Sequence, residues 1–296
     1  MDRNKLSPGT VIVSLVFLAA AFSTFASSDI LTGQVSVPNA APTLADVMLY
    51  DADLGTIQLT AGSDQNIVYC NGTITDNNGF GDVDVAWAYI YNGSGDDLPA
   101  ATDKNERYDN ASCDLVSGSG VTIVAECAFT IEHEALDGTW TCNITANDSV
   151  NAIGKNQGTN DIDTLTGISI LESAIDFGTL GLGASSGTGI ETNVTNQGNV
   201  IVDIRVNGSD YACDVQGTID VNNTRYDVVD SNWATMTENL TETPMTDTAF
   251  DLGIEGIATN EDTNSTKNEF WTIVVPGTGV SGTCTNDIWI TGTLDA

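Results

Sequence analysis

The chain has 296 residues, of which 41 are acidic and 8 basic, and its formal net charge at pH 7 is −33. A surface this negative repels the phosphates of nucleic acids and of anionic lipids, so neither is an expected partner. The single histidine, His133, excludes metal sites that need two histidines, and we expect it at an exposed strand end. A hydrophobic fraction of 41% is too high for a disordered acidic chain and predicts a folded core.

The first predicted element is the apolar run at residues 11–26 (VIVSLVFLAAAFSTFA), which follows the basic residues Arg3 and Lys5. This layout is typical of an export signal that is cleaved after Ala26. In a second interpretation the run is retained as an apolar helix, and in a third it is a plain anchor. The first two interpretations both place the rest of the chain outside the cell.

The second interpretation rests on residues 6–13 (LSPGTVIV), which resemble the start of archaeal type IV pilins and archaellins. In those families a short basic leader is removed, and the apolar helix packs into the filament core. The resemblance implies an assembly role for Val11, Ile12, Leu15 and Phe17.

An extended segment is expected at residues 27–43, between the apolar run and the first domain. Its β-branched stretch 30–37 (ILTGQVSV) stands before Pro38 and Pro42. Such a stretch can be added as a strand to the open sheet edge of a neighbouring molecule. We therefore count Ile30, Val35 and Val37 among the assembly residues.

Beyond this segment, short runs rich in Val, Ile, Thr, Tyr and Trp alternate with Gly, Asn and Asp. This pattern predicts an all-β chain with two β-sandwich domains, at residues 44–171 and 172–296. The strands expected in the first domain are 44–50, 66–75, 83–91, 112–116, 121–131, 139–147 and 164–171, with a loop or linker at 151–163. Those expected in the second domain are 189–195, 199–207, 215–220, 249–254, 270–275 and 283–294.

Six cysteines in an exported chain indicate disulfides, and six cysteines allow 15 pairings. Residues 137–142 (DGTWTC) resemble the sixth-strand motif of immunoglobulin-like domains, in which Asp-x-x-Tyr-x-Cys is usual. The resemblance implies that the first sandwich is immunoglobulin-like, that Cys142 pairs with Cys70, and that Trp87 packs on this bridge. Trp140 stands where the motif has tyrosine, and its indole can replace the hydroxyl only as a hydrogen-bond donor.

Cys113 and Cys127 flank the glycine-serine turn at residues 117–120, which suits a cross-strand pair. The remaining two, Cys213 and Cys284, both lie in the second domain and would pair there. No Cys-x-x-Cys is present, so metal binding by cysteine is not expected.

The whole mature chain resembles a group of secreted archaeal surface proteins that have an immunoglobulin-like domain and a second β-sandwich. The resemblance rests on residues 69–73 (YCNGT), 75–79 (TDNNG), 138–145 (GTWTCNIT), 176–180 (DFGTL), 195–199 (TNQGN) and 270–276 (FWTIVVP). It implies an envelope or appendage protein without enzymatic activity.

Asn-x-Ser/Thr sequons are roughly twice as frequent as composition alone would give, which predicts N-glycosylation of an extracellular surface. The alternative is that a β-protein rich in Asn and Thr produces sequons by composition. The ten sequons start at Asn71, Asn92, Asn110, Asn143, Asn147, Asn193, Asn207, Asn222, Asn239 and Asn264.

A calcium site is the one cofactor that the sequence suggests. Asp76, Asn78, Asp82 and Asp84 lie within nine residues, and Gly79 allows a tight turn between them. Hard cations need several oxygen ligands at close range. The spacing is not that of an EF-hand, and the alternative is that Asp and Asn simply form turns here.

No phosphate-binding loop, dinucleotide fingerprint or Gly-x-Ser-x-Gly elbow is present, so we expect no enzyme. Trp271 and Trp289 alternate with aliphatic residues and are expected in the core. We predict an adhesive structural protein at the cell surface, a subunit of an archaeal filament or sheath that binds further copies of itself. Cell-surface glycans or another cell are further candidate partners. The alternative is a monomeric secreted module that binds carbohydrate or a receptor.

Overall fold

The computed structural model describes residues 32–93, 103–257 and 264–295, apart from the side chains of residues 246–249. The chain divides into two units, Met1–Asn39 and Ala40–Ala296. The predicted signal or pilin-like helix and the residues Val11, Ile12, Leu15, Phe17 and Ile30 lie outside the described residues. Among the described residues, no helix is long and apolar enough to span a membrane.

In the first unit, residues 32–39 have no regular secondary structure, and all of them are exposed. The side chains of Val35 and Val37 are 84% and 75% exposed. These two valines therefore have no apolar contact that would shield them within the described chain.

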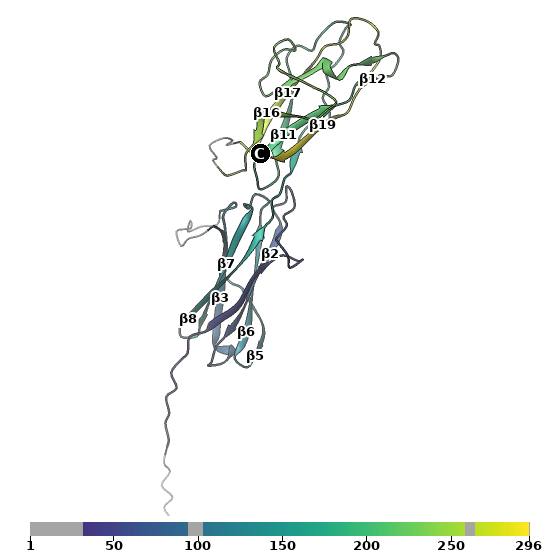
Figure 1. The fold of residues 1–296 in the computed structure, drawn as a ribbon. Helices are drawn as coiled ribbons and strands as arrows, with labels where there is room; N and C mark the ends of the chain where they lie inside the picture. Colours follow the sequence, from purple (N-terminus) through teal and green to yellow (C-terminus); the bar gives the residue numbers. More distant parts are fainter. Residues whose placement is uncertain (1–31, 94–102, 258–263, 296) are drawn as a thin grey trace, which may run out of the picture. The chain divides into compact units, whose positions relative to one another are not determined.

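In the larger unit, the first sandwich consists of two four-stranded antiparallel sheets, with strand orders β1-β2-β6-β5 and β4-β3-β7-β8 (Figure 1). This is the arrangement of an immunoglobulin-like domain, as expected. The strands are β1 (Thr43–Tyr50), β2 (Asn66–Thr75), β3 (Val83–Asn92), β4 (Arg107–Asn110), β5 (Asp114–Ser119), β6 (Thr122–Ile131), β7 (Gly138–Asp148) and β8 (Ile153–Ile162), with a short 3₁₀ helix at Phe80–Asp82.

The core of this sandwich forms around β2 and β7. The side chains of β2 alternate between buried and less buried positions, whereas most residues of β7 are buried. Cys70 of β2 and Cys142 of β7 form a disulfide between the two sheets. Trp140, two residues before Cys142, is fully buried, and its indole Nε1 donates to the carbonyl of Leu136 over 2.7 Å. The prediction that Trp87 packs on the bridge is wrong, because Ala86 and Ala88 face the core and Trp87 points the other way along β3.

The last strand of the first sandwich lies where a loop was expected. Strand β8 pairs with β7 along its whole length, although its sequence, IGKNQGTNDI, resembles a turn. Gly154 and Gly158 explain the choice, because a Cβ at Gly154 would collide with the backbone of Pro42, just before β1, and a Cβ at Gly158 with that of Val47 in β1. Glycine thus allows β1 to lie close against β8.

The strand expected at residues 164–171 does not belong to the first sandwich. Its central part, β9 (Ile168–Ile170), pairs instead with β10 (Ile190–Asn196) in the second sandwich, and Ile168 packs on that core. The prediction is wrong because β8 already closes the first sandwich. The connection between the two sandwiches is therefore the stretch 163–167 rather than a boundary at residue 171.

The second sandwich contains one five-stranded sheet, β15-β14-β17-β10-β9, and two three-stranded sheets, β16-β11-β19 and β13-β12-β18. The remaining strands are β11 (Val202–Gly208), β12 (Tyr211–Cys213), β13 (Thr218–Ile219), β14 (Thr224–Asp227), β15 (Glu238–Asn239), β16 (Met245–Leu252), β17 (Thr266–Ile273), β18 (Cys284–Thr285) and β19 (Ile288–Leu294), with a 3₁₀ helix at Val221–Asn223.

Of the two tryptophans that were predicted in the core of this sandwich, only one lies there. Trp271 is fully buried, as expected, and its indole donates to Thr192 Oγ1 over 2.9 Å. Trp289 is 48% exposed, so its expected place in the core is wrong. Ile288 and Ile290 turn their side chains inward, and the intervening residue of the strand faces outward.

Candidate functional site

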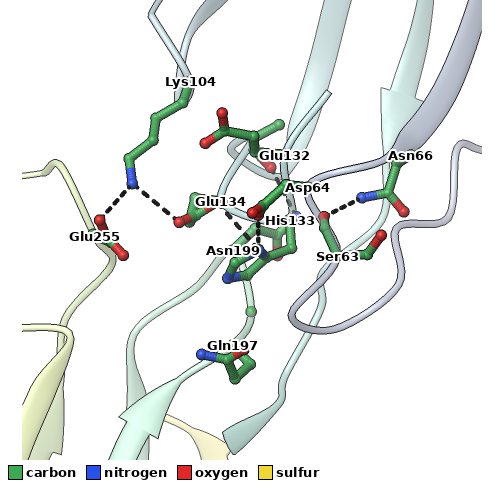
Figure 2. Close-up of polar contacts among 12 residues, drawn as sticks. Ser63, Asp64, Asn66, Lys104, Glu132, His133, Glu134, Gln197, Asn199 and Glu255 are labelled. Atoms are coloured by element: carbon green, nitrogen blue, oxygen red, sulfur yellow. Dashed lines mark hydrogen bonds and ion pairs between the residues drawn. The ribbon is translucent and has the colours of Figure 1, made fainter. Parts of the chain in front are cut away.

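A cluster of charged residues lies where the first sandwich contacts the second (Figure 2). Nζ of Lys104 is 3.0 Å from Oε1 of Glu134 in the first sandwich and 2.9 Å from Oε1 of Glu255 in the second. Glu134 also contacts His133, whose Nδ1 lies 3.2 Å from Glu134 Oε2 and 3.3 Å from Asp64 Oδ1. These five residues, which we call the junction cluster, form one chain of contacts in which Lys104 and His133 each lie between two carboxylates.

The ion pairs of the junction cluster compensate the charge of a buried carboxylate. The side chain of Glu134 is only 4% exposed, whereas that of Lys104 is 27% exposed. Burial alone lowers the pKa of the Lys104 ammonium, but its hydrogen bonds to Glu255 and Glu134 outweigh this effect and raise the pKa above its usual value. Lys104 therefore remains charged and compensates a carboxylate that has little access to water.

Hydrogen bonds between asparagine side chains and the backbone also connect the two sandwiches. The side-chain amide of the buried Asn199 donates to the carbonyls of Ala135 and Asp163, and its Oδ1 accepts from the N–H of Leu165 at 2.7 Å. Asn105 donates from Nδ2 to the carbonyls of Glu134 and Glu255, each over 3.0 Å. The sequence analysis placed Asn199 at the start of an expected strand, and that pattern gave no signal of its contacts with the first sandwich.

The expected place of His133 at an exposed strand end is wrong. The residue is only 7% exposed and belongs to the junction cluster. The two flanking glutamates suggested solvent exposure, but one of them, Glu134, is buried with it. The groups of the cluster contact one another, and through Lys104 and Glu255 they connect the two sandwiches.

A groove of about 890 Å³ opens in the second sandwich. Apolar side chains of three strands line it, among them Ile170 of β9, Ile273 of β17 and Ile290 of β19. The irregular stretch 172–182 also lines the groove. In the described part of the chain β9 and β19 are the last strands of their sheets, so the groove opens beside two free sheet edges.

The six cysteines form the three predicted pairs: Cys70–Cys142, Cys113–Cys127 and Cys213–Cys284. The second pair joins β6 to the segment preceding β5, and its residues are 14 apart in sequence. The third joins β12 to β18. All three bridges close within a single sandwich.

The sequons divide by exposure. Asn222, Asn239 and Asn264 are exposed, and all three lie in the second sandwich. The other seven asparagines are partly buried. At Asn71 the amide already binds Tyr50 and Glu126, and the side-chain oxygens of Asn71 and Asn143 are buried without a hydrogen-bond partner among the described residues.

Of the four residues predicted to bind calcium, the structure brings only Asp76 and Asp82 together. Asp148, which the sequence reasoning missed because it lies 66 positions further along the chain, joins them. Asp84 is exposed and outside this group. Asn78 instead binds the backbone, since its Oδ1 accepts from the N–H of Ala40 at 2.7 Å.

No protein-family model matches the chain. No curated protein matches it either. Among solved structures, it is similar to the chaperone–tip adhesin complex of CFA/I fimbriae, with 8% identity over 86% of this chain and 85% of the other and a TM-score of 0.28.

Two further structures show likeness of the same order. One is the CsuC–CsuE chaperone–tip adhesion subunit complex of Csu pili from Acinetobacter baumannii, with 10% identity, coverage of 84% and 92%, and a TM-score of 0.33. The other is a carbohydrate-binding module of the β-sandwich superfamily, with 9% identity, coverage of 86% and 98%, and a TM-score of 0.26. Because these TM-scores are low, the likenesses carry no argument about function.

Proposed function

We propose that the protein is an extracellular structural protein whose copies assemble by strand addition. Residues 30–37 of one copy would lie along the groove of the second sandwich of the next copy, beside the edge of β19. The observation that carries the proposal is the exposure of Val35 and Val37 within residues 32–39, which have no regular secondary structure. Backbone hydrogen bonds to the sheet edge would supply affinity, and the two valines would pack on the isoleucines that line the groove.

Charge favours this segment as the contact between copies. The chain carries a net charge of −33, so two copies repel each other over most of their surfaces. Residues 30–45 contain no charged side chain. A neutral segment can approach the groove without the repulsion that other surfaces would meet.

The extracellular location is supported by the three disulfides, since such bonds persist in oxidising surroundings. The sequon excess and the apolar run at residues 11–26 point the same way. A filament or sheath of an archaeal surface, an adhesive role toward glycans or another cell, and the absence of enzymatic activity remain parts of this proposal.

The test uses matched pairs of substitutions in the segment. Val35→Asp with Val37→Asp places two charges on the face that would enter the groove and should leave monomers. Gln34→Asp with Ser36→Asp adds the same charge on the opposite face and should retain assembly. Light scattering and electron microscopy of the full chain measure the outcome, and equal behaviour of the two double variants would contradict strand addition.

A peptide provides the complementary measurement. A synthetic peptide of residues 28–43 should bind saturably to the chain lacking residues 1–37, and a peptide with both valines replaced by aspartate should not. Assembly of this truncated chain into polymers without the peptide would overturn the proposal, because it lacks the donor segment.

A carbohydrate-binding module is the second candidate, and the exposure of Trp289 favours it. An exposed tryptophan face can stack on a sugar ring. In this alternative the full chain is a monomer that binds glycans on an array, and Trp289→Ala abolishes the binding. Trp87→Ala, a change of a partly buried tryptophan in the first sandwich, is the control.

A further inference from the structure

Three carboxylates from separate parts of the chain meet at one end of the first sandwich. Asp76 follows β2, Asp82 ends the 3₁₀ helix before β3, and Asp148 is the last residue of β7. One oxygen of each lies within 4.8 Å of the others. We call Asp76, Asp82 and Asp148 the carboxylate triad.

The burial of the triad is unusual for acidic side chains. Asp76 is 0% exposed and Asp148 is 1% exposed, while Asp82 is partly buried. Oδ2 of Asp76 is buried and has no hydrogen-bond partner among the described residues. A buried carboxylate oxygen without a partner loses its hydration and gains nothing in return, unless a ligand binds it.

Hydrogen bonds hold the three carboxylates in position. The N–H of Asn78 donates to Asp76 Oδ1 over 2.8 Å. The N–H groups of Val150 and Ala152 both donate to Asp148 Oδ1, over 3.0 and 2.8 Å.

The hydroxyl of Ser149 donates to Asp82 Oδ1. No basic side chain in the described part of the chain forms an ion pair with Asp76 or Asp82. A bound cation would therefore compensate the negative charge of these closely placed groups.

We propose that the carboxylate triad binds one calcium ion. Two ligand oxygens on opposite sides of Ca²⁺ are about 4.8 Å apart, twice a Ca–O distance of about 2.4 Å, so a triad within that limit can contact a single ion. Mg²⁺ demands near-ideal octahedral geometry and gives up its waters reluctantly, so a group of three protein carboxylates suits Ca²⁺ better. Zn²⁺ prefers nitrogen and sulfur ligands, which the triad does not offer.

The ligand set differs from the one that spacing in the sequence suggested. Asp148 replaces Asp84, and Asn78 acts on the backbone rather than on the ion. Asn78 binds both Asp76 and Ala40, where the larger unit begins. An ion in the triad would therefore tie the turn after β2, the turn after β7 and the beginning of the sandwich together.

The second group of possible ligands, Asp64, His133 and Glu134, does not compete with the triad as a metal site. Lys104 already contacts Glu134, and its positive charge would repel a cation. The calcium proposal is independent of strand addition, because it concerns the other sandwich and a different measurement.

The test is calorimetric titration of the full, chelator-treated chain with calcium chloride at physiological ionic strength. We expect one saturable site per chain, with an affinity in the range of extracellular calcium modules, a Kd of about 10⁻⁴–10⁻³ M. Asp76→Asn and Asp148→Asn should each weaken binding by about ten-fold or more, because each removes a ligand charge. In Asp148→Asn the new side-chain amide keeps an oxygen that can accept from Val150 and Ala152, so this variant should fold.

Asp84→Asn is the matched control, because it removes one charge from an exposed aspartate nearby and should leave calcium affinity within about two-fold. Calcium should also raise the melting temperature of the wild type and of this control, but not that of Asp76→Asn. Absence of saturable binding would overturn the proposal, and so would equal loss in Asp84→Asn, which would indicate diffuse screening. If the triad variants do not fold, anomalous diffraction from calcium-soaked wild-type crystals decides, and the lack of a peak at the triad overturns it.

Discussion

Nζ of Lys104 in the first sandwich lies 2.9 Å from Oε1 of Glu255 in the second. The same ammonium compensates the buried Glu134, so one side chain serves both the interior of the first sandwich and its contact with the second. The chain has only eight basic residues. The placement of one of them at this junction indicates that the connection between the sandwiches is a specific feature of the fold.

Lys104→Met should destabilise the chain by about 1–3 kcal/mol, because it leaves the carboxylate of Glu134 buried without its counter-charge. Urea unfolding measures the change in the free energy of unfolding. Lys155→Met, which removes the same charge from an exposed residue of β8, is the control and should change stability by less than about 0.5 kcal/mol. Equal losses in both variants would mean that net charge, rather than the junction, determines stability.

The stability of the junction should also depend on pH through Glu132. Burial raises the pKa of the Glu132 carboxyl above its usual value, and the negative charge of Glu134 raises it further. A raised pKa in the folded state means that ionisation of Glu132 at neutral pH opposes folding, and that this cost disappears as the pH falls below the pKa of the unfolded state.

Glu132→Gln should therefore be more stable than the wild type at about pH 7, and the difference should vanish at about pH 4 and below. Urea unfolding over this pH range provides the measurement. Glu106→Gln, a change at an exposed glutamate of the turn before β4, should show no such pH-dependent gain. A stability gain that persists at acid pH would contradict the role of ionisation.

The fold class followed from the sequence because alternation is a local signal. Strand β2 was predicted with its observed ends, Asn66 and Thr75, since its β-branched and aromatic residues run up to the turn at residues 76–79. Strand β8 was missed because its glycines and asparagines satisfy a tertiary requirement, the close approach of β1. Short strands such as β4, β12, β14 and β15 carry too few residues for a periodic pattern.

Several other strands begin at residues different from those that the sequence predicted. The strand expected at residues 112–116 begins later, as β5, and the one expected at 283–294 divides into β18 and β19. The stretch 199–207 was placed three residues too early, because Asn199 belongs to the junction rather than to β11. In each case a contact distant in sequence determines where the strand begins.

The candidate sites were harder to predict than the fold, since they combine distant segments. Two members of the carboxylate triad were predicted, because Asp76 and Asp82 are close in sequence, whereas Asp148 is distant from them. The sequence did not predict the junction cluster. His133 and Glu134 looked like an exposed charged run, and nothing near them in the sequence indicates that Lys104 and Glu255 arrive from elsewhere.

The hydrogen bond from Trp140 to Leu136 should contribute measurably to the first sandwich. Trp140→Phe removes the only donor of the indole and leaves the Leu136 carbonyl without this partner in a partly buried site, at a cost of about 1–3 kcal/mol. Trp87→Phe makes the same chemical change on the outward face of β3 and should cost less than about 1 kcal/mol. Urea unfolding compares the two variants, and a larger loss at Trp87 would show that the core tryptophan has been assigned incorrectly.

Glycan occupancy should follow the exposure of the asparagine side chains. We expect Asn239 and Asn264 to carry glycans, because both are exposed, whereas at Asn71 the amide is bound to Tyr50 and Glu126. A glycan at Asn71 would have to displace these partners in the folded sandwich.

Mass mapping of glycopeptides from the chain made in its native host measures this occupancy. Asn239→Gln should lower the glycan mass of the protein, and Asn71→Gln, the matched change at a partly buried sequon, should leave it unchanged. Occupancy at Asn71 with none at Asn239 or Asn264 would contradict the prediction. It would mean that glycans are attached before the first sandwich folds, because the folded structure commits the Asn71 amide to other partners.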